Sequence, residues 1–399
     1  MAAMWSPIIG LVLLLLPLAP SSCSYIMYPL EGNAYPTGHI VVKLNIGEPP
    51  RPYYLDIDTG SNVTWLECHH PDHGCVDCSP GPSHYYRPAL SNLRVDCKDP
   101  FCAALHADLP GVNPACAKED PHQCHYKIGY VSGTTEGVLS NDTITLREGN
   151  SEYIVFGCGY KQKRRNPLQK PTAVQGLLGL GMGRVGFVAQ LKKQNVISKD
   201  VIGHCLSMKE GGYLFIGDYN YPSAGMTWAP MRKYDFFYTP GQGTLHLDGQ
   251  QVYANGMDVI FDSGATYTYR QVMAFGFLQV KDILGDAVTV EDRDLPLCWG
   301  RKKSFESLDE AKNVFKQLTL RFDNNIVMNI PVRNYLVYTE AKNLCMGILN
   351  GTEVGQDQRI IIGDVTMRDM LVVYDNERGM LGWVHRTCPS RPPATTSRL

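Results

Sequence analysis

Asp58-Thr59-Gly60-Ser61 and Asp262-Ser263-Gly264-Ala265 share one pattern, in which an Asp is followed by a small hydroxyl residue and a Gly. Each segment follows an apolar run typical of a β-strand, at residues 53–57 and 258–261. The Gly allows the chain to turn sharply, so each carboxylate is predicted to stand exposed at a strand end. Roughly 200 residues, the length of one domain, separate the two Asp residues. Each half is therefore predicted to supply one carboxylate to a shared cleft.

A single Asp-Thr-Gly or Asp-Ser-Gly is an ordinary turn sequence, so the surroundings of the two segments matter. The first is followed by Leu177-Leu178-Gly179-Leu180-Gly181, and the second by Ile360-Ile361-Ile362-Gly363-Asp364. Each half thus contains a strand, an Asp turn and a later apolar strand that ends in Gly. This arrangement indicates an internal duplication.

The duplicated motif resembles the pepsin-like aspartic proteases, and the resemblance extends from about Gly38 to about His385. The cysteines that crowd behind the first Asp turn resemble those of the nucellin-like, nepenthesin-related plant branch. The family implies a mainly β, bilobal fold, with two β-rich lobes and a catalytic cleft between them. It also implies a monomer that acts on protein or peptide substrates without a cofactor or metal ion.

The chain divides into four predicted parts. Residues 8–20 form an apolar run too short to span a bilayer, and small residues follow it, which is typical of a secretory signal peptide. The tail is rich in Pro, Ser and Thr, which predicts disorder. The boundaries are 1–24 for the signal peptide, 25–230 for the N-terminal lobe with a Cys-rich insertion at about 68–124, 231–388 for the C-terminal lobe and 389–399 for the disordered tail. Only about fourteen residues lie between the predicted signal peptide and the first clear strand, at 39–46, so no conventional inhibitory pro-segment is expected.

Charge and targeting exclude several partners. The formal net charge is −2 and no long run of charge occurs. The basic stretch at 161–165 lacks interleaved aromatic residues. We therefore interpret it as a solvated loop and not as a patch that binds nucleic acid. Neither a nucleic acid nor a membrane is expected as a partner. The signal peptide predicts the secretory pathway, with an extracellular (apoplast) or vacuolar destination left open.

The cysteines predict disulfides. Of 13 Cys residues, Cys23 lies within the predicted signal peptide, which leaves an even number in an oxidising compartment. Connectivity cannot be deduced from the sequence, although Cys298 and Cys345 are the natural pair within the second half. The run at 68–78 also contains Cys, His and Asp residues of the types that bind zinc. Disulfides are favoured there because an oxidised sulfur cannot act as a thiolate ligand.

Asp58 and Asp262 are the predicted catalytic residues. Two adjacent carboxyls cannot both ionise easily, so one is expected to activate water while its protonated partner polarises the peptide carbonyl. Asp56 lies two residues before Asp58 and shares its strand face. Because Asp56 has no following turn and no duplicate, it is assigned an accessory or solvated role.

The resemblance assigns roles to residues around the pair. The hydroxyls of Thr59 and Ser263 are expected to bond to the opposite lobe, with local turn bonds as the alternative. Tyr130 is expected to close over the substrate as the flap tyrosine, hydrogen-bonded by Trp65, although on its own it would be interpreted as a core residue. Val131 replaces the Gly or Ala of many relatives, so a stiffer flap and a narrower space beneath it are expected.

Three sequons are present, at Asn62, Asn141 and Asn350. Asn62 lies within the first Asp turn and is expected to stay bare, whereas Asn141 and Asn350 are possible glycosylation sites. Helical patterns are few. A capping box at 307–310 predicts a helix toward residue 316, and a second helix is predicted at 186–195. Asp248-Gly249 and Asn255-Gly256 are hairpin-turn signals.

The predicted function is a secreted aspartic endopeptidase that hydrolyses peptide bonds with a water activated by two Asp residues. The alternative is a catalytically silent binding or inhibitor protein of the secretory pathway on the same fold, because some plant relatives inhibit cell-wall enzymes. Silent relatives usually lose an Asp, its Gly or the flap tyrosine, and here all of them are present. A disulfide-rich structural domain, the third hypothesis, leaves the duplicated Asp turns unexplained.

Overall fold

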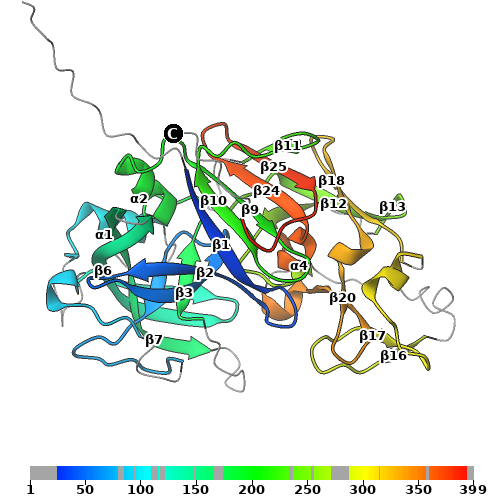
Figure 1. Cartoon of the computed structure of the whole chain (residues 1–399), viewed down its shortest axis with the longest axis horizontal. Helices are drawn as coiled ribbons and strands as arrows, with labels where there is room; N and C mark the ends of the chain where they lie inside the picture. Colours follow the sequence, from blue (N-terminus) through cyan, green and yellow to red (C-terminus); the bar gives the residue numbers. More distant parts are fainter. Residues whose placement is uncertain are drawn as a thin grey trace, which may run out of the picture.

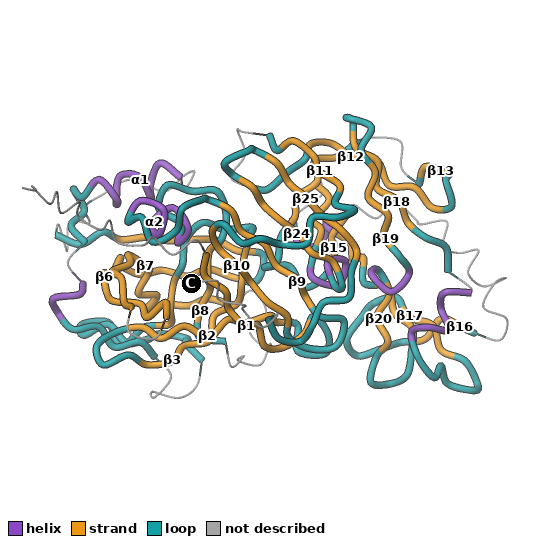
Figure 2. The backbone as a smooth tube through the Cα atoms, turned by 45° about the horizontal axis from the view of Figure 1, so that its top comes forward, coloured by secondary structure: helices purple, strands orange, loops and turns teal. Residues whose placement is uncertain are grey.

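The computed structural model describes residues 25–79, 85–93, 95–108, 116, 122–147, 150–164, 174–232, 237–252, 256–270, 287–313, 315–355 and 359–392. The predicted signal peptide and residues 393–399 of the predicted tail lie outside this part of the chain. Strands account for most of the regular structure and helices are few and short, as Figure 2 shows. The mainly β fold predicted from the sequence is confirmed.

The largest sheet has thirteen strands, in the order β11-β25-β24-β9-β10-β1-β2-β3-β8-β4-β7-β6-β5. Their bounds are β1 Tyr25–Asn33, β2 His39–Ile46, β3 Arg51–Asp58, β4 Trp65–Glu67, β5 His125–Tyr130, β6 Gly133–Arg147, β7 Asn150–Arg164, β8 Gly176–Gly179, β9 Val201–Leu206, β10 Gly212–Gly217, β11 Thr227–Pro230, β24 Met370–Asp375 and β25 Met380–His385. Alternate residues of β2 are buried, which is the period-two pattern of a strand with one face on the core. Strands β9, β10 and β24 are buried along their whole length.

Two smaller sheets form the other half. The first has the order β19-β18-β12-β14-β23-β15-β22, with β13 paired to β12, and the second has the order β16-β17-β21-β20. Their bounds are β12 Gly241–Leu247, β13 Gln250–Gln251, β14 Met257–Phe261, β15 Thr268–Arg270, β16 Val288–Val290, β17 Cys298–Gly300, β18 Leu318–Phe322, β19 Val327–Ile330, β20 Leu336–Tyr338, β21 Leu344–Met346, β22 Ile348–Asn350 and β23 Arg359–Ile362.

The end of the chain joins the two halves. Strands β24 and β25 come late in the sequence, yet β24 pairs with β9 and β25 pairs with β11. In Figure 1 these strands lie between β2, β3, β6 and β7 on one side and β12, β18 and β20 on the other. Residues 370–385 are therefore part of the sheet built mostly by the first half, and a division of the chain near residue 230 does not separate two self-contained sheets.

The duplication predicted from the sequence appears in the strand pairing. Strand β3 runs parallel to β8, with Asp58 opposite Gly179, and β14 runs parallel to β23, with Phe261 opposite Ile362. The Asp58 carbonyl accepts a hydrogen bond from Leu180 N–H at 2.8 Å. In both halves the strand that ends at the Asp turn is thus held against the later apolar strand.

The described helices are short: α1 Pro100–Asp108, α2 Phe187–Lys193 and α4 Asp364–Met367, with 3₁₀ helices η1 Leu90–Leu93, η3 Leu308–Asn313, η4 Val332–Asn334 and η5 Gly351–Val354. Helix α2 confirms the prediction at 186–195. The helix predicted from 307 toward 316 is a 3₁₀ helix that ends at Asn313. Its capping carboxylate, on Glu310, accepts from the backbone N–H of Glu306 at 2.5 Å. Such tight turns suit short segments, because their hydrogen-bond geometry is too poor for long ones.

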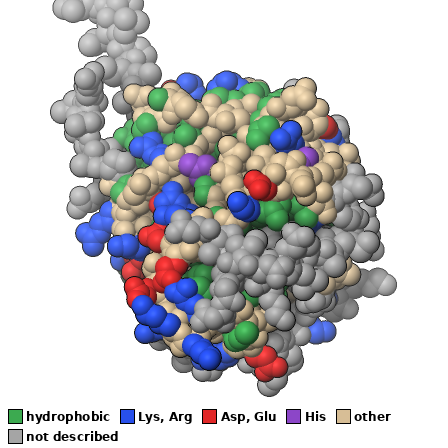
Figure 3. Space-filling model, turned by 90° about the vertical axis from the view of Figure 1, so that its right-hand side faces the viewer, with side chains coloured by type: hydrophobic (Ala, Val, Ile, Leu, Met, Phe, Trp, Pro, Cys, Tyr) green, Lys and Arg blue, Asp and Glu red, His purple; other side chains and the backbone are tan. Residues whose placement is uncertain are grey.

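The predicted Asp248-Gly249 hairpin is confirmed. Both residues have positive φ, at 49° and 80°, and they join β12 to β13. Asn255, of the other predicted turn, lies outside the described residues. Within the described chain, no helix combines the length and the apolar character needed to cross a membrane. On the face drawn in Figure 3, acidic and basic side chains are interspersed.

The predicted disulfides are present, and the Cys298–Cys345 pair is confirmed. The others are Cys68–Cys158, Cys75–Cys78, Cys97–Cys116, Cys102–Cys124 and Cys205–Cys388. Cys68, Cys75 and Cys78 are therefore oxidised, so the run at 68–78 offers no thiolate for zinc.

Cys205–Cys388 joins β9 to the segment that follows β25, across a sequence separation of 183 residues. We expect the paired change Cys205→Ala and Cys388→Ala to lower the free energy of unfolding by about 2–4 kcal/mol, because a long loop is no longer closed in the unfolded chain. The matched control is Cys75→Ala with Cys78→Ala, which opens a loop of separation 3 and should cost less. Urea denaturation measures both, and equal losses in the two variants would contradict the loop-length argument.

Candidate active site

The two Asp turns have the same local geometry. Asp58 is the last residue of β3, and Asp262 directly follows β14. The backbone N–H of Gly60 donates to Asp58 Oδ1 at 2.7 Å, and that of Gly264 donates to Asp262 Oδ1 at 2.9 Å. Each carboxylate is therefore held by the turn that its own Gly makes possible.

Reciprocal hydrogen bonds connect the two turns. The Thr59 hydroxyl donates to the carbonyl oxygen of Phe261 at 3.0 Å and accepts from Ser263 N–H at 3.0 Å. The Ser263 hydroxyl donates to the carbonyl oxygen of Ile57 at 3.0 Å and accepts from Thr59 N–H at 3.1 Å. Both hydroxyl residues are buried. The predicted bonds to the opposite lobe are confirmed, and they take the place of the alternative local turn bonds.

Each of the two turn glycines leaves the space that the carboxyl group of the opposite Asp occupies. A Cβ on Gly60 would lie 2.5 Å from the carboxyl carbon of Asp262, and a Cβ on Gly264 would lie 2.5 Å from that of Asp58. No real Cβ tolerates such a contact, so any other residue would displace the opposite carboxyl group. The structure thus brings Asp58 and Asp262 together, as the sequence predicts.

The environment raises the pKa of both carboxyls. Burial and then the charge of Asp262 raise the pKa of Asp58 well above its usual range. Burial also raises the pKa of Asp262. Only Asp58 accepts a side-chain hydroxyl bond from its own turn, from Ser61 at 2.8 Å, because the corresponding residue of the second turn is Ala265. The arrangement favours a state in which one carboxyl keeps its proton.

Asp56 is partly buried and bonded by other residues, which favours the accessory role over the solvated role expected as its alternative. Its side chain is 18% exposed, and its Oδ2 lies 2.7 Å from His39 Nδ1. Its Oδ1 accepts from Ile40 N–H at 3.1 Å. Its charge also contributes to the raised pKa of Asp262, so Asp56 lies within electrostatic reach of the pair.

Asp364 lies behind the second Asp turn, although the sequence motifs did not predict a role for it there. Asp364 is 2% exposed, and its backbone N–H donates to the Ala265 carbonyl oxygen at 2.8 Å, directly behind the second turn. Burial, followed by the charges of Asp56, Asp262 and Asp58, raises its pKa well above the usual range. The sequence feature that could have indicated Asp364 is its position immediately after Gly363, which ends the second apolar strand.

Tyr130, the predicted flap tyrosine, lies within electrostatic reach of Asp58. Tyr130 ends β5, and its hydroxyl accepts from Trp65 Nε1–H at 3.0 Å, as predicted. Ser61, which donates to Asp58 Oδ2, lies in the turn that faces this hydroxyl and lowers the pKa of Tyr130. Burial and the nearby charge of Asp58 raise the pKa of Tyr130. Trp65 therefore holds the Tyr130 hydroxyl within electrostatic reach of the first carboxylate.

Val131 does not occupy the space beneath the flap. Tyr130 pairs with Gly133, which places Val131 and Ser132 at the tip of the hairpin. Val131 is 39% exposed, whereas Ser132 lines the cavity beside Asp56 and Tyr130. The expected narrowing by Val131 is therefore wrong for this conformation.

The sequons differ in exposure. Asn62 is 7% exposed with its Nδ2 buried, so a glycan has no room there in the folded protein. Asn141 is exposed on β6. Asn350 is half-buried, and its Oδ1 accepts from Thr352 N–H at 3.1 Å. Glycosylation of Asn141 and Asn350 remains a prediction.

Two groups of described residues have the spacing of metal ligands: Cys102, His106 and Cys124, and Asp292, Cys298 and Cys345. In each group the two cysteines form a disulfide with one another. Neither group therefore offers a thiolate to a metal ion.

Comparison with known proteins defines the class. Residues 41–218 match the family described as Xylanase inhibitor N-terminal, and residues 249–385 match Xylanase inhibitor C-terminal. The chain is 42% identical to an aspartic proteinase of Oryza sativa subsp. indica, over 97% of this chain and 98% of the relative. It is 27% identical to aspartic proteinase 36 of Arabidopsis thaliana, over 91% of this chain and 77% of the relative. The chain therefore belongs to the pepsin-like aspartic protease family, as the sequence resemblance predicts.

Solved structures share the fold at low sequence identity. The basic 7S globulin from soybean superposes with a TM-score of 0.66 at 17% identity, covering 91% of this chain and 95% of the globulin. The aspartic proteinase from Irpex lacteus superposes with a TM-score of 0.61 at 17% identity, covering 91% of this chain and 98% of the proteinase. Together they support the bilobal β-rich architecture.

Gly60→Ala tests the close approach of the two turns. We expect a loss of about 1–3 kcal/mol in the free energy of unfolding, because the new Cβ overlaps the Asp262 carboxyl group. The matched control is Gly129→Ala, where nothing lies within 4 Å of the added Cβ. Chemical denaturation compares the two, and an equally small effect in both variants would show that the turns do not meet so closely.

Ala265→Thr tests the missing hydroxyl of the second turn. A hydroxyl that donates to ionised Asp262 lowers the raised pKa of that group. If Asp262 carries the upper titration step of the pair, the shared proton is then lost at lower pH. The alkaline limb of kcat/KM for peptide hydrolysis is expected to move down. A charge-assisted bond contributes roughly 1.5–3 kcal/mol, which is at most about one to two pH units. Complete pH profiles of both proteins on one peptide measure this, and superimposable alkaline limbs or an upward shift would refute it.

Proposed function

We propose that this protein is a secreted aspartic endopeptidase. The observation that carries the proposal is the pair of carboxyls, Asp58 and Asp262, one from each half, held face to face with the pKa of both raised. Hydrolysis without a metal or a covalent nucleophile needs a base to activate water and an acid to polarise the carbonyl and then protonate the amine. A pair that holds one proton supplies both at acid pH.

In this mechanism the ionised carboxyl takes a proton from the attacking water while the protonated one donates to the peptide carbonyl oxygen. The roles then reverse as the amine leaves. The titration steps belong to the pair and not to either residue alone. Tyr130 is proposed to contact the substrate from the flap, where Trp65 fixes its hydroxyl. The substrates are proteins or peptides, in line with the aspartic proteinases among the relatives.

The proposed compartment is the secretory pathway, either extracellular or vacuolar. The disulfides support this, because such bonds persist in oxidising compartments. A monomer is proposed, since the paired carboxyls both come from one chain. The nucellin-like assignment rests on the crowded cysteines behind the first Asp turn and remains part of this proposal.

The second candidate is a catalytically silent binding or inhibitor protein. The descriptions of the two matching families, which both name a xylanase inhibitor, favour it. Both Asp turns, their glycines and Tyr130 weigh against it, because an inhibitor has no use for two carboxyls that oppose one another at raised pKa. The purified protein distinguishes the candidates, since an endopeptidase cleaves a peptide library at acid pH and is blocked by a statine inhibitor.

Asp58→Asn and Asp262→Asn are each expected to remove nearly all hydrolysis, because Asn keeps the shape but cannot complete the shared-proton pair. The double variant should be little worse than either single one, since the carboxyls act as a unit. EDTA should leave the wild-type rate unchanged. Initial rates on one peptide measure all four proteins, and thermal denaturation checks their folding. A single variant that keeps most of its turnover would contradict the assignment.

A further inference from the structure

A cavity of about 180 Å³ is lined by Asp56, which lies two residues before Asp58 on β3. It passes beneath the flap, where Tyr130, Ser132 and residues 133–135 line it. Its other walls include Asp56, Trp65 and Leu177. Asp56 lies two residues before Asp58 on β3, so the cavity lies one strand step from the first carboxyl of the proposed reacting centre.

The strand register explains how these side chains come together. Asp56 pairs with Leu177 across β3 and β8, and Leu177 pairs with Trp65 across β8 and β4. Paired residues on neighbouring strands point to the same face, so Asp56, Leu177 and Trp65 form one row. Residues two apart on a strand lie about 7 Å apart. Asp58 therefore lies about 7 Å from Asp56 along β3. Glu67 lies about 7 Å from Trp65 along β4.

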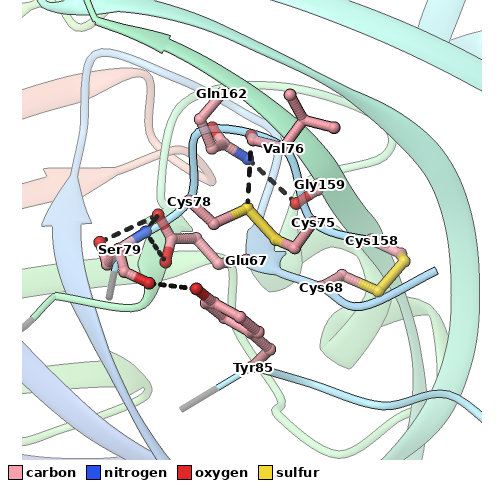
Figure 4. Close-up of a disulfide and its surroundings, with 10 residues drawn as sticks. All are labelled: Glu67, Cys68, Cys75, Val76, Cys78, Ser79, Tyr85, Cys158, Gly159 and Gln162. Atoms are coloured by element: carbon pink, nitrogen blue, oxygen red, sulfur yellow. Dashed lines mark hydrogen bonds between the residues drawn. A yellow bond between two sulfur atoms is a disulfide. The ribbon is translucent and has the colours of Figure 1, made fainter. Parts of the chain in front are cut away.

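Glu67 lies at the far end of the cavity and is held in position by Ser79. The Ser79 backbone N–H donates to its carboxylate oxygens at 3.1 and 3.0 Å, and the Ser79 hydroxyl donates at 3.1 Å (Figure 4). Ser79 directly follows the Cys75–Cys78 disulfide, which fixes the loop that carries it. Both residues are buried and both line the cavity.

We propose that this cavity takes the cationic side chain of a Lys or Arg residue of the substrate, with Asp56 and Glu67 as the residues that determine this preference. The inference rests on the proposed endopeptidase function and specifies its substrate class. The aliphatic stem of the substrate residue packs on Trp65 and Leu177, and its charged end is hydrogen-bonded by a carboxylate. An apolar side chain of the same length would cover Asp56 without replacing its contact with water, which is unfavourable.

Three basic side chains, those of His39, Lys163 and Arg164, also line the cavity, so the preference rests on direct contact between the substrate cation and a carboxylate. His39 already bonds Asp56 Oδ2, and Ile40 N–H bonds its Oδ1. A carboxylate accepts about four hydrogen bonds, so Asp56 has room for a further donor. Lys163 and Arg164 line the cavity from the end of β7. Lys163 is exposed, so solvent and salt screen its charge, whereas Arg164 is half-buried and its charge opposes a substrate cation.

The test measures binding to the Asp262→Asn variant, so that it does not depend on turnover. The probes are peptides of one sequence in which one position at a time is Lys, norleucine or Glu. Norleucine is the matched control, because it has the length of the Lys side chain without the ammonium group. At one position we expect Lys to bind about tenfold more tightly than norleucine, and Glu to bind most weakly. Calorimetry gives the dissociation constants.

Adding Asp56→Asn or Glu67→Gln should bring the ratio of the Lys-peptide affinity to the norleucine-peptide affinity close to one. Lys163→Gln should preserve or increase this ratio. Thermal denaturation confirms that each variant is folded. Equal binding of Lys and norleucine at every position, a preference for Glu, or a ratio that survives both carboxylate changes would overturn the proposal. So would an absence of measurable binding. Hydrolysis of the same peptides by the wild-type protein reports separately on the endopeptidase function, so the two proposals can fail independently.

Discussion

The reciprocal hydrogen bonds of Thr59 and Ser263 are the contact on which the rest of the site depends. Each hydroxyl crosses to the opposite half and bonds the backbone just before the other Asp. The bonds fix the two turns at a separation that leaves no room for a Cβ on Gly60 or Gly264. Two carboxyls that would otherwise repel one another are thereby kept adjacent, and the repulsion is relieved because one of them retains its proton.

The sheets provide the rigidity that this contact needs. Each Asp turn is anchored by a parallel strand pair, β3 with β8 and β14 with β23, and strands β24 and β25 join the second half of the chain to the main sheet. A mobile connection between the halves would allow the carboxyls to separate into water, where their pKa values would return to the usual range. Residues far from the cleft, such as Cys205 and Cys388, therefore help to maintain its chemistry.

The sequence predicts the elements of the site that are written in contiguous motifs. The two Asp turns, their supporting apolar strands, Tyr130 with Trp65, and the Cys298–Cys345 pair were all accessible because local spacing or the family resemblance specifies them. Asp364 and the His39–Asp56 pair were not, because their importance comes from burial and from neighbours on other strands. The 3₁₀ helix at 308–313 and the exposed position of Val131 were mispredicted for the same reason, since tertiary packing and not local pattern decides them.

The central claim is that Asp58 and Asp262 share one proton well above the pH at which an isolated Asp ionises. Carbon-13 NMR of the wild-type protein, labelled at the Asp side-chain carboxyl carbons, follows that proton directly. For the wild-type pair the account predicts two widely separated titration steps, the upper one well above the usual range of an Asp side chain. In Asp58→Asn it predicts that a single titration step replaces these two. Two carboxyl signals that both titrate at ordinary pKa values, independently of one another, would contradict it.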